Sequence, residues 1–391
     1  MVTLTSADNA LKSVYLGVVS DQLNIKSNPL LSKIKQSTAD VWGKEVIKLA
    51  PFGLNGGVGA GAEDGALPQS FSNQYVQFKA SLKNLYGKIE LSDKSIRASQ
   101  NNSGAFVNLL NAEMEGLIKA SSFNLGRMLY ADGSGKLLKT FIHEEGASTL
   151  TNCDQVKSFM EGMTTEVVDI ASGQALTNSV RRVSKVDRGS KAVNFSSGFA
   201  SLLNPTDHAI TMQNSYNKEI TGLGKIFSND GSLYGVDRNT HSWMKPYMKE
   251  NVGAISDVVI QEAIDYLDEV TGSDVDFITC SSDVKRAYQN YLSTFRRNID
   301  YMDLEGGYKA MSFSGVPIIS DRFIEDGTMY LLNTKEFVLH QLCDWEWLEG
   351  DDGKILKQSL NSPTYMATLV KYAELICDKP NGQAKLSGIT A

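Results

Sequence analysis

The chain has 391 residues, of which 42% are hydrophobic and 21% are charged, as in an ordinary folded protein with two or three lobes. Its formal net charge of −7 disfavours a protein whose main task is to grip nucleic acid. The four cysteines form no CxxC pair, which disfavours a zinc site and a disulfide framework: Cys153, Cys280, Cys343 and Cys377. No segment reaches the roughly 20 apolar residues that span a bilayer, so we expect a protein made in a cytoplasm, without a membrane partner.

The first 50 residues are expected to form an arm. An amphipathic helix is predicted from Ser6 or Ala7 to Leu23, and Pro29 ends that segment. A second short helical piece then carries Leu30, Leu31 and Ile34. The arm is mildly basic, which fits a solvated helix face or a contact with DNA or an acidic neighbour. Its lysines are Lys26, Lys33, Lys35, Lys44 and Lys48.

A glycine-rich segment, residues 53–65, follows the arm and has six glycines in thirteen positions. Ordering so much glycine costs conformational entropy, so this segment should be mobile unless a partner holds it. Residues 57–62 match a degenerate GxGxxA dinucleotide pattern, but Pro68 stands where the helix of such a site should begin. We therefore expect a loop tip in a subunit contact, or a plain linker, rather than a phosphate-binding loop.

A strand and an unusually long helix are predicted next. Apolar residues at a period of two indicate a half-buried strand of a ribbon, at Val76, Phe78, Ala80 and Leu82. The helix should run from Ser103 to Tyr130, which at 1.5 Å per residue is roughly 40 Å. Its apolar stripe comprises Phe106, Leu109, Leu110, Met114, Leu117, Ile118, Leu125, Met128 and Leu129. Gly133 and Gly135 should supply the left-handed residues that end it.

Short apolar runs alternate with turn residues between positions 156 and 226, which predicts a small all-β lobe or an insert of paired strands. The predicted strands are Glu166–Ile170, Val180–Val186, Lys191–Phe195 and His208–Met212. Basic residues in this region fit either a solvated strand face or a patch that faces DNA or another subunit. They are Arg181, Arg182, Lys185, Arg188 and Lys191.

From Ser256 onward helices alternate with strands, which predicts a mixed α/β layer. Ser256 is the expected N-cap of a helix that ends at Gly272, and Ser282 should open a second helix. Strands are predicted at Asp276–Cys280, Ala310–Phe313, Val316–Ile319 and Met329–Leu332. The C-terminal region is predicted as an exposed acidic hairpin at Asp344–Gly353, an extended run at Tyr365–Ile376 and a surface tail after Pro380.

The order and spacing of several segments resemble those of a known family. They are LYGKIELSDKSI at 85–96, NNSGAFVNLL at 101–110, ADGSG at 131–135, SNDGSLYGVDRN at 228–239, FSGVPIISD at 313–321 and ATLVKYAELICDKPNGQAKLSGI at 367–389. Together they are similar to the major capsid proteins of tailed bacteriophages over nearly the whole chain. The resemblance implies an α+β phage major-capsid fold with a long spine helix, an extended β-ribbon loop, a β-rich insert and a mixed α/β axial domain.

The resemblance also implies a division of the chain into parts. These are an N-terminal arm at 1–50, the extended loop with its glycine-rich tip at 51–95, a peripheral domain with the spine helix at 96–155, a β-rich lobe at 156–226, an axial domain at 227–342, and an acidic hairpin with the C-terminal return at 343–391. Contacts between subunits are then expected at Gly56, Gly57, Gly59, Gly61, Val76 and Phe78. Some members cross-link a loop lysine to a neighbour, but ordinary ladder-face lysines are the simpler interpretation of Lys79, Lys83 and Lys88.

The implied function is that of a major capsid protein in the icosahedral head of a tailed phage or prophage. The chain would form hexamers and pentamers, work with scaffolding, portal and decoration proteins, and touch packaged DNA non-specifically. It would be assembled in the bacterial host cytoplasm and reside in the virion. The arm helix begins almost at once, so we expect scaffolding to come from a separate protein or from a segment cleaved off earlier, and Met1 favours the separate protein. The nearest alternative is an encapsulin-like nanocompartment shell, which resembles the same fold but encloses enzymes.

No recognisable catalytic, cofactor-binding or metal-binding pattern occurs in the sequence. HExxH and GxSxG motifs are missing, and the Asp-rich segments lack EF-hand spacing. His143, Glu144 and Glu145 are adjacent and would point apart, which makes a poor metal site. Trp345 and Trp347 are expected as core or interface anchors rather than a sugar-binding platform. We therefore expect neither enzyme activity nor a cofactor, and a soluble enzyme is the weakest interpretation.

Overall fold

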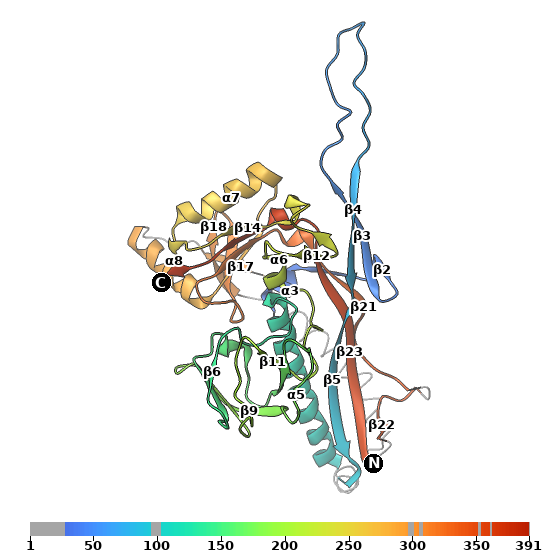
Figure 1. Ribbon diagram of the computed structural model, residues 1–391, viewed down its shortest axis with the longest axis vertical. Coiled ribbons are helices and arrows are strands. Elements are labelled where there is room, and N and C mark those ends of the chain that lie inside the picture. Colours follow the sequence, from blue (N-terminus) through green and yellow to red (C-terminus); the bar gives the residue numbers. More distant parts are fainter. Residues whose placement is uncertain are drawn as a thin grey trace.

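The computed structural model describes residues 28–94, 103–295, 301–304, 308–350, 353–359 and 362–390. A long ribbon projects from a body that contains three large sheets and one long helix (Figure 1). The predicted arm helix at 6–23 lies outside the described residues, as do Asp351 and Asp352 of the acidic segment. Within the described ranges, no helix has the length and apolar content needed to cross a membrane.

A five-stranded sheet forms the longest layer of the body. Its strands are β1 (Lys35–Ser37), β5 (Lys83–Ser92), β21 (Phe337–Trp347), β22 (Lys357–Gln358) and β23 (Thr364–Cys377). β23 pairs antiparallel with β5 along ten residues and with β21 on its other edge. Residues 83–92, which the resemblance placed in the extended loop, are thus paired inside the body. The short helix α3 (Pro29–Lys33) precedes β1 and buries Leu30 and Leu31, as expected.

The hairpin expected at Asp344–Gly353 is wrong in its first half. Asp344 to Trp347 continue β21, and Glu346 and Trp347 pair with Val370 and Leu369 of β23. The physical reason is burial: the Trp345 and Trp347 rings are only 4% and 5% exposed, so they hold this segment in the core instead of releasing it as a surface turn.

Helix α5 (Ser103–Tyr130) packs beside β5 and has the predicted bounds. The predicted stripe is buried at Met114, Ile118, Leu125, Met128 and Leu129. Leu117 is partly buried against the same core, while the side chains of residues 103–112 lie outside the description. From residue 125 to the end the helix is buried on every side, so it enters the body rather than lying on its surface. Gly133 and Gly135 follow with φ values of 82° and 78°, as predicted.

The ribbon is a three-stranded antiparallel sheet. It comprises β2 (Val41–Trp42), β3 (Glu45–Phe52) and β4 (Gln74–Ser81). β3 and β4 pair along their whole length, from Glu45 opposite Ser81 to Phe52 opposite Gln74. The boundary expected at residue 50, between the N-terminal arm and the extended loop, therefore falls inside β3. The last residues of the expected arm form one strand of the ribbon.

A separate lobe is built almost entirely of strands, as predicted. They are β6 (Ile142–His143), β7 (Thr149–Thr151), β8 (Thr164–Asp169), β9 (Arg181–Asp187), β10 (Ala192–Phe195) and β11 (His208–Met212), in the sheet order β11-β8-β9-β10-β7-β6. The lobe has its own core, in which Leu150, Phe159, Val193 and Ile210 are fully buried. It begins earlier than position 156, because β6 and β7 pair with the later strands.

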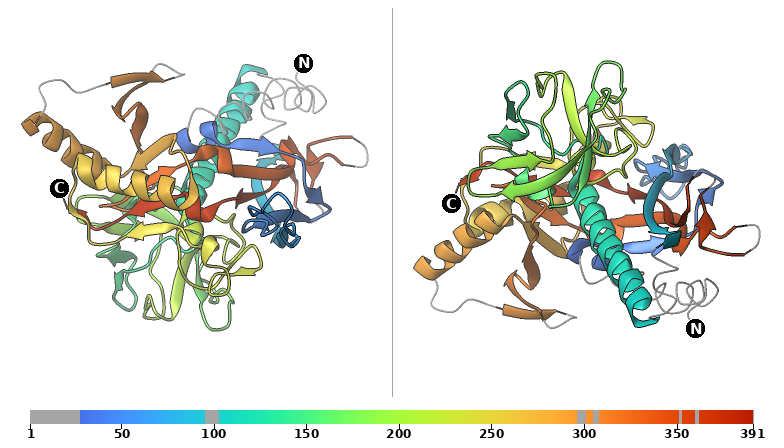
Figure 2. Two further views of the ribbon diagram at one scale, coloured as in Figure 1. Left: turned by 90° about the horizontal axis from the view of Figure 1, so that it is seen from above. Right: turned by 90° about the horizontal axis from the view of Figure 1, so that it is seen from below.

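The third sheet has seven strands and two helices. Its strand order is β14 (Tyr247–Lys249), β24 (Ala384–Leu386), β20 (Met329–Leu332), β16 (Phe277–Cys280), β19 (Val316–Ser320), β18 (Tyr308–Phe313) and β17 (Tyr301–Leu304). Ile278 and Leu331 share a core with helices α7 (Asp257–Thr271) and α8 (Ser282–Phe295), whereas Phe277 and Leu332 join the core of the spine helix. Both faces of the sheet are therefore covered, and the two helices run along its outer side (Figure 2).

The tail after Pro380 was expected on a surface, and this expectation is wrong. β24 lies between β14 and β20, and Ala384 and Leu386 are fully buried. The alternation of apolar residues at 384 and 386 fits an interior strand, and its partners are supplied by distant segments. The remaining elements are helix α6 (Leu223–Ile226), strands β12 (Ser232–Leu233), β13 (Val236–Asp237), β15 (Gly253–Ala254) and β25 (Ile389–Thr390), and 3₁₀ turns at Val156–Ser158, Ser242–Met244, Thr334–Glu336 and Pro380–Gly382.

Candidate interaction surfaces

The base of the ribbon is fixed to the body by aromatic and backbone contacts. The Phe52 ring stacks on Trp243 with a centroid distance of 5.6 Å. Phe78 lies 5.7 Å from the Tyr234 ring and 6.1 Å from the Trp243 ring. The N–H of Lys79 donates to the carbonyl of Tyr234 at 2.9 Å. These contacts set the direction in which the ribbon leaves the body.

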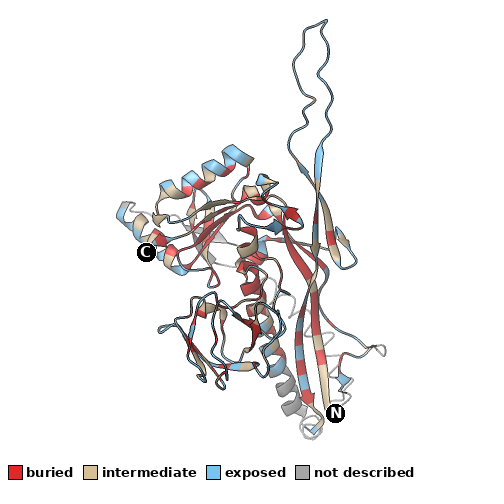
Figure 3. Cartoon of the chain, in the orientation of Figure 1, coloured by how far each residue is buried: buried red, intermediate tan, exposed pale blue. Residues whose placement is uncertain are grey.

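Beyond Phe52 the ribbon opens into a loop, residues 53–73, which we call the tip (Figure 1). Nearly every residue of the tip is exposed (Figure 3). The local contacts of the tip join its residues to one another. Asn55 Oδ1 accepts from the Gly57 N–H at 2.9 Å, and Gly56 faces the Phe71 ring. No helix follows the glycines, so the tip lacks the architecture of a dinucleotide site.

The six residues expected at subunit contacts fall into two groups. Gly56, Gly57, Gly59 and Gly61 lie in the tip, whereas Val76 and Phe78 lie in β4. Val76 is partly buried, and Phe78 is fully buried in the core of its own chain. The period-two pattern of β4 indicated a half-buried strand correctly, but the buried face is turned toward the body of the same chain.

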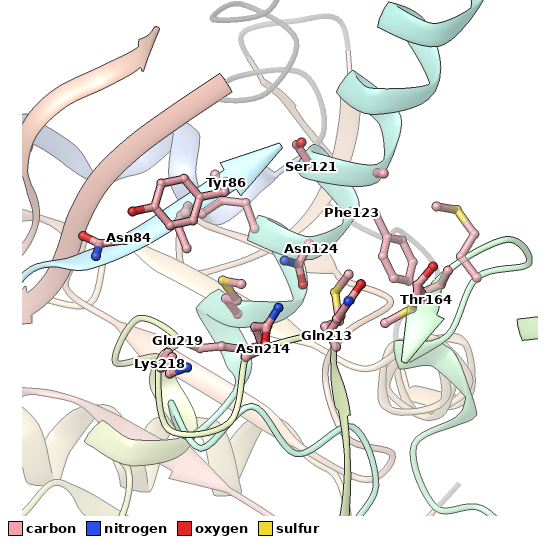
Figure 4. A pocket seen from close by; sticks show the side chains of 18 of the residues that line it. Asn84, Tyr86, Ser121, Phe123, Asn124, Thr164, Gln213, Asn214, Lys218 and Glu219 are labelled. Carbon is pink, nitrogen blue, oxygen red and sulfur yellow. The ribbon is translucent and has the colours of Figure 1, made fainter. Parts of the chain in front are cut away.

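A cleft of about 1050 Å³ lies between β5, helix α5 and the β lobe (Figure 4). Its apolar surface comes from Met128, Met160, Met163, Met212, Phe123 and Trp345. Amide side chains line it as well, at Asn84, Asn124, Gln213, Asn214 and Asn217. The sequence singled out Met128 and Trp345 for other reasons and none of the other residues, because five separate segments supply them. Only the polar run at 213–218 and the close pair of methionines at 160 and 163 could have signalled the site.

The cleft lining carries three cationic and two carboxylate side chains. Lys83, Arg182 and Lys218 contribute cationic side chains. The carboxylate of Glu219 forms an ion pair with the guanidinium of Arg127. Glu161 is the other carboxylate of the lining, and it accepts from the backbone N–H of Val186 at 3.4 Å.

The basic residues predicted on the lobe divide into structural and exposed groups. Arg181 donates to the carbonyl oxygens of Asn178 and Gly198, which ties neighbouring loops together. Lys185, Arg188 and Lys191 are exposed around the β9–β10 turn. The carboxylate of Asp187 lies in the same turn and interacts with Lys185, so this part of the lobe carries charges of both signs.

The cysteine and histidine side chains of the described residues have structural surroundings. Within them, no group of three His, Cys, Asp or Glu side chains could hold a metal ion. All four cysteines are free, and burial raises the pKa of Cys153 and Cys280 to about 12, which keeps these thiols protonated. Both ring nitrogens of His143 are engaged with backbone groups, so this residue is structural.

No protein-family model matches the chain, and no curated protein matches it. Among solved structures, the cyanophage A-1(L) capsid asymmetric unit contains a chain that matches with a TM-score of 0.58 and 12% sequence identity, over 94% of this chain and 93% of that chain. The capsid of Myoviridae phage XM1 matches with a TM-score of 0.48 and 10% identity, over 93% of this chain and 96% of that chain. The holo-SrpI encapsulin complex from Synechococcus elongatus matches with a TM-score of 0.44 and 10% identity, over 95% of each chain.

At these levels of identity, structural likeness establishes a fold and leaves function to be argued separately. The likeness to the cyanophage capsid chain extends over 94% of this chain. The expected α+β architecture with a spine helix is confirmed. This chain therefore has the fold of a tailed-phage major capsid protein.

Proposed function

We propose that this chain is the major capsid protein of a tailed phage or prophage, a structural subunit without catalytic activity. One observation carries the proposal: a chain with the capsid fold over 94% of its length also extends a ribbon whose tip has almost no contact with its own body. A monomeric protein gains nothing from such a projection, whereas a shell subunit can lay it on a neighbour.

In this proposal the parts of the chain have distinct tasks. The ribbon and its tip reach an adjacent subunit, with the tip glycines Gly56, Gly57, Gly59 and Gly61 and the partly buried Val76 as contact residues. Phe78 is left out of this surface because it is buried in its own chain. The spine helix and the five-stranded sheet form the peripheral domain, and the seven-stranded sheet with α7 and α8 forms the axial domain around which rings of five and six close.

The proposed setting is the virion, after assembly in a bacterial host cytoplasm. Scaffolding, portal and decoration proteins would be further partners, and packaged DNA would be touched non-specifically. The exposed Lys185, Arg188 and Lys191 could meet either nucleic acid or an acidic surface of another subunit, while the net charge of −7 disfavours a tight general grip on DNA.

Shortening the tip tests the proposal. Replacing residues 54–72 by a short Gly-Ser turn should leave the protomer folded, because the ribbon base is fixed by Phe52 and Phe78 outside the deleted segment. Sedimentation should then show that closed particles are lost, while circular dichroism stays unchanged. A control that keeps the whole tip and replaces only Ser72 by Ala should assemble normally. Normal particles from the shortened chain would contradict the proposed role of the tip.

The contents of native particles separate the phage shell from an encapsulin-like nanocompartment. Double-stranded DNA inside the particles would support the proposal. A shell filled with a specific enzyme cargo and free of nucleic acid would contradict it and favour the nanocompartment.

A further inference from the structure

Two Asn-Gly pairs occur in this chain, Asn55–Gly56 in the tip and Asn381–Gly382 in the 3₁₀ turn at Pro380–Gly382. In such a pair the backbone nitrogen of the glycine can attack the amide carbon of the asparagine side chain, since glycine has no Cβ to hinder the approach. The two pairs contain the same residues, but their surroundings differ. The structure therefore decides which pair reacts.

The pair in the tip is open to solvent and its amide is held in place. Asn55 and Gly56 are both exposed, on a loop that projects away from the body (Figure 1). Asn55 Oδ1 accepts from the Gly57 N–H at 2.9 Å, and Asn55 Nδ2 donates to Asn73 Oδ1 at 3.1 Å. Within the part of the chain that the structure describes, the N–H of Gly56 has no hydrogen-bond acceptor. The nitrogen that must attack is therefore available, while the group that it attacks is oriented.

The reaction at this pair needs only water. The Gly56 nitrogen loses its proton and bonds to Cγ of Asn55, the Cγ–Nδ2 bond breaks, and the departing amide nitrogen takes up the proton and leaves as ammonia. Negative charge develops on Oδ1 during the attack, and the Gly57 N–H already donates to this oxygen. Water then opens the five-membered imide at either of its carbonyl groups. The products are aspartate, or isoaspartate in which the main chain runs through the side-chain carbons.

The second pair is locked by its surroundings. Gly382 is buried, and its N–H donates to the carbonyl of Lys379 at 3.1 Å. An added Cβ on Gly382 would lie 2.8 Å from Ser273 Oγ, so this backbone has no room to rotate toward Asn381 Cγ. The reaction must wait until the turn opens locally. Loss of one backbone hydrogen bond alone makes the reactive state scarcer, on the order of tenfold.

We propose that Asn55 is a self-modification site, at which the free protomer converts asparagine to aspartate and isoaspartate without an enzyme. Glu63 and Asp64 are the only charged residues of the tip, so conversion takes its formal charge from −2 to −3. The isoaspartate product also adds one atom to the main chain of the tip. In the shell function proposed above, on which this consequence rests, a converted tip no longer fits the neighbouring subunit. Conversion then limits how long an unassembled chain can still join a shell.

Peptide mass spectrometry of the incubated full-length protomer tests the modification. At mildly alkaline pH, Asn55 should lose its amide faster than Asn381 by on the order of tenfold or more. Unfolding the chain in guanidinium chloride should bring the two rates together, because the fold no longer protects the second pair. If Asn55 of the folded protomer keeps its amide as long as Asn381 does, the modification site is wrong.

A variant of the attacking residue gives a second measurement. Gly56→Ala adds a methyl group whose nearest neighbour is the Phe71 ring at 3.4 Å, an ordinary packing distance, so the tip should keep its conformation. The methyl group hinders the attack, and Asn55 should therefore keep its amide longer in this variant than in the wild type. Equal rates of conversion in the two chains would contradict an attack by the Gly56 nitrogen.

Sedimentation of fresh and aged protomer tests the consequence for assembly. For the wild type, the particle yield of aged relative to fresh protein should fall in step with the converted fraction of Asn55. For Asn55→Gln this ratio should stay near its starting value, because glutamine would have to close a less favourable six-membered ring. Circular dichroism must show that the aged chains remain folded.

The outcomes separate the modification from the shell function. Converted wild type that yields as many particles as fresh protein would overturn the limit on assembly, and so would an equal loss with age in Asn55→Gln. A fresh wild type that never forms particles would instead overturn the shell function, while mass spectrometry still decides whether Asn55 is modified.

Discussion

The guanidinium of Arg127, in the last turn of helix α5, is ion-paired with the carboxylate of Glu219, on the segment that leads out of the β lobe. The two side chains are only 3% and 1% exposed. Arg127 also donates to Asn124 Oδ1 at 2.7 Å. The pair therefore fastens the lobe to the spine helix, and it removes a negative charge from the wall of the cleft.

Breaking this pair from one side should be costly. Glu219→Ala leaves a buried, uncompensated guanidinium, and we expect the free energy of unfolding to fall by about 3–5 kcal/mol. Arg127→Met/Glu219→Leu removes both charges and should cost clearly less than Arg127→Met and Glu219→Leu added together. Denaturant unfolding of the wild type, these two single variants and the double variant measures the coupling. Strictly additive losses would mean that the two residues are not coupled.

Glu374 makes the stability of the protomer depend on pH. Burial raises the pKa of its carboxyl from the ordinary value of 4.5 to about 7, although its Oε1 accepts from the Thr221 N–H at 2.6 Å. Because the folded-state pKa is the higher one, the native chain binds more protons than the unfolded chain between these values. Stability should therefore fall as the pH rises through this window and level off above it.

The Glu374→Gln variant isolates this effect. Glutamine keeps an oxygen for the Thr221 N–H but cannot ionise, so it avoids the cost of a buried charge. The free energy of unfolding of the variant minus that of the wild type should rise by about 2–3 kcal/mol when the pH is raised from roughly 5 to 8. Urea unfolding at both values measures the difference. Parallel pH dependences for the two chains would show that Glu374 does not titrate in this range.

Two glycines should respond to alanine with opposite signs. Gly116 lies in helix α5, and an added Cβ would meet nothing within 4 Å. Gly116→Ala should stabilise the protomer by about 1 kcal/mol, because alanine is the better helix former. At Gly222 an added Cβ would lie 2.2 Å from the Met128 oxygen and 2.4 Å from the Ala131 oxygen. Gly222→Ala should cost about 1–3 kcal/mol or more.

Thermal melts of the two variants measure the contrast. Gly116→Ala serves as the control for Gly222→Ala, since both changes add one methyl group. A stabilising Gly222→Ala would mean that helix α6 does not press its N-terminus against the end of the spine helix.

Helices and strands whose ends are marked by capping or turn residues could be predicted from the sequence. Helix α7 begins after Ser256, whose hydroxyl accepts from the Val259 N–H at 3.4 Å, and ends at Gly272 with a φ of 60°. The lobe strands β8, β9, β10 and β11 were predicted to within two residues at each end, because turn residues separate them in the chain, whereas β6 and β7 were not predicted. In each of these cases the residues that define the element lie within about one turn of its ends.

Features that depend on pairing between distant segments could not be predicted. Residues 83–92 were predicted to belong to the extended loop. They form β5, which pairs with β23, from Ser92 opposite Thr364 to Lys83 opposite Ala373. The tail reads as a surface segment, yet β24 completes a sheet between two earlier strands. The cleft was missed for the same reason, since its walls come from β5, α5, β21 and three separate parts of the lobe.

Electron microscopy of the full-length chain, expressed in bacteria and supplied with a scaffolding protein if needed, tests the central claim most directly. The account predicts closed shells in which copies form rings of five and six, with density for the ribbon of each copy lying on a neighbouring subunit. A protein that stays monomeric at every concentration, with or without scaffold, would contradict the claim that this chain is a shell subunit.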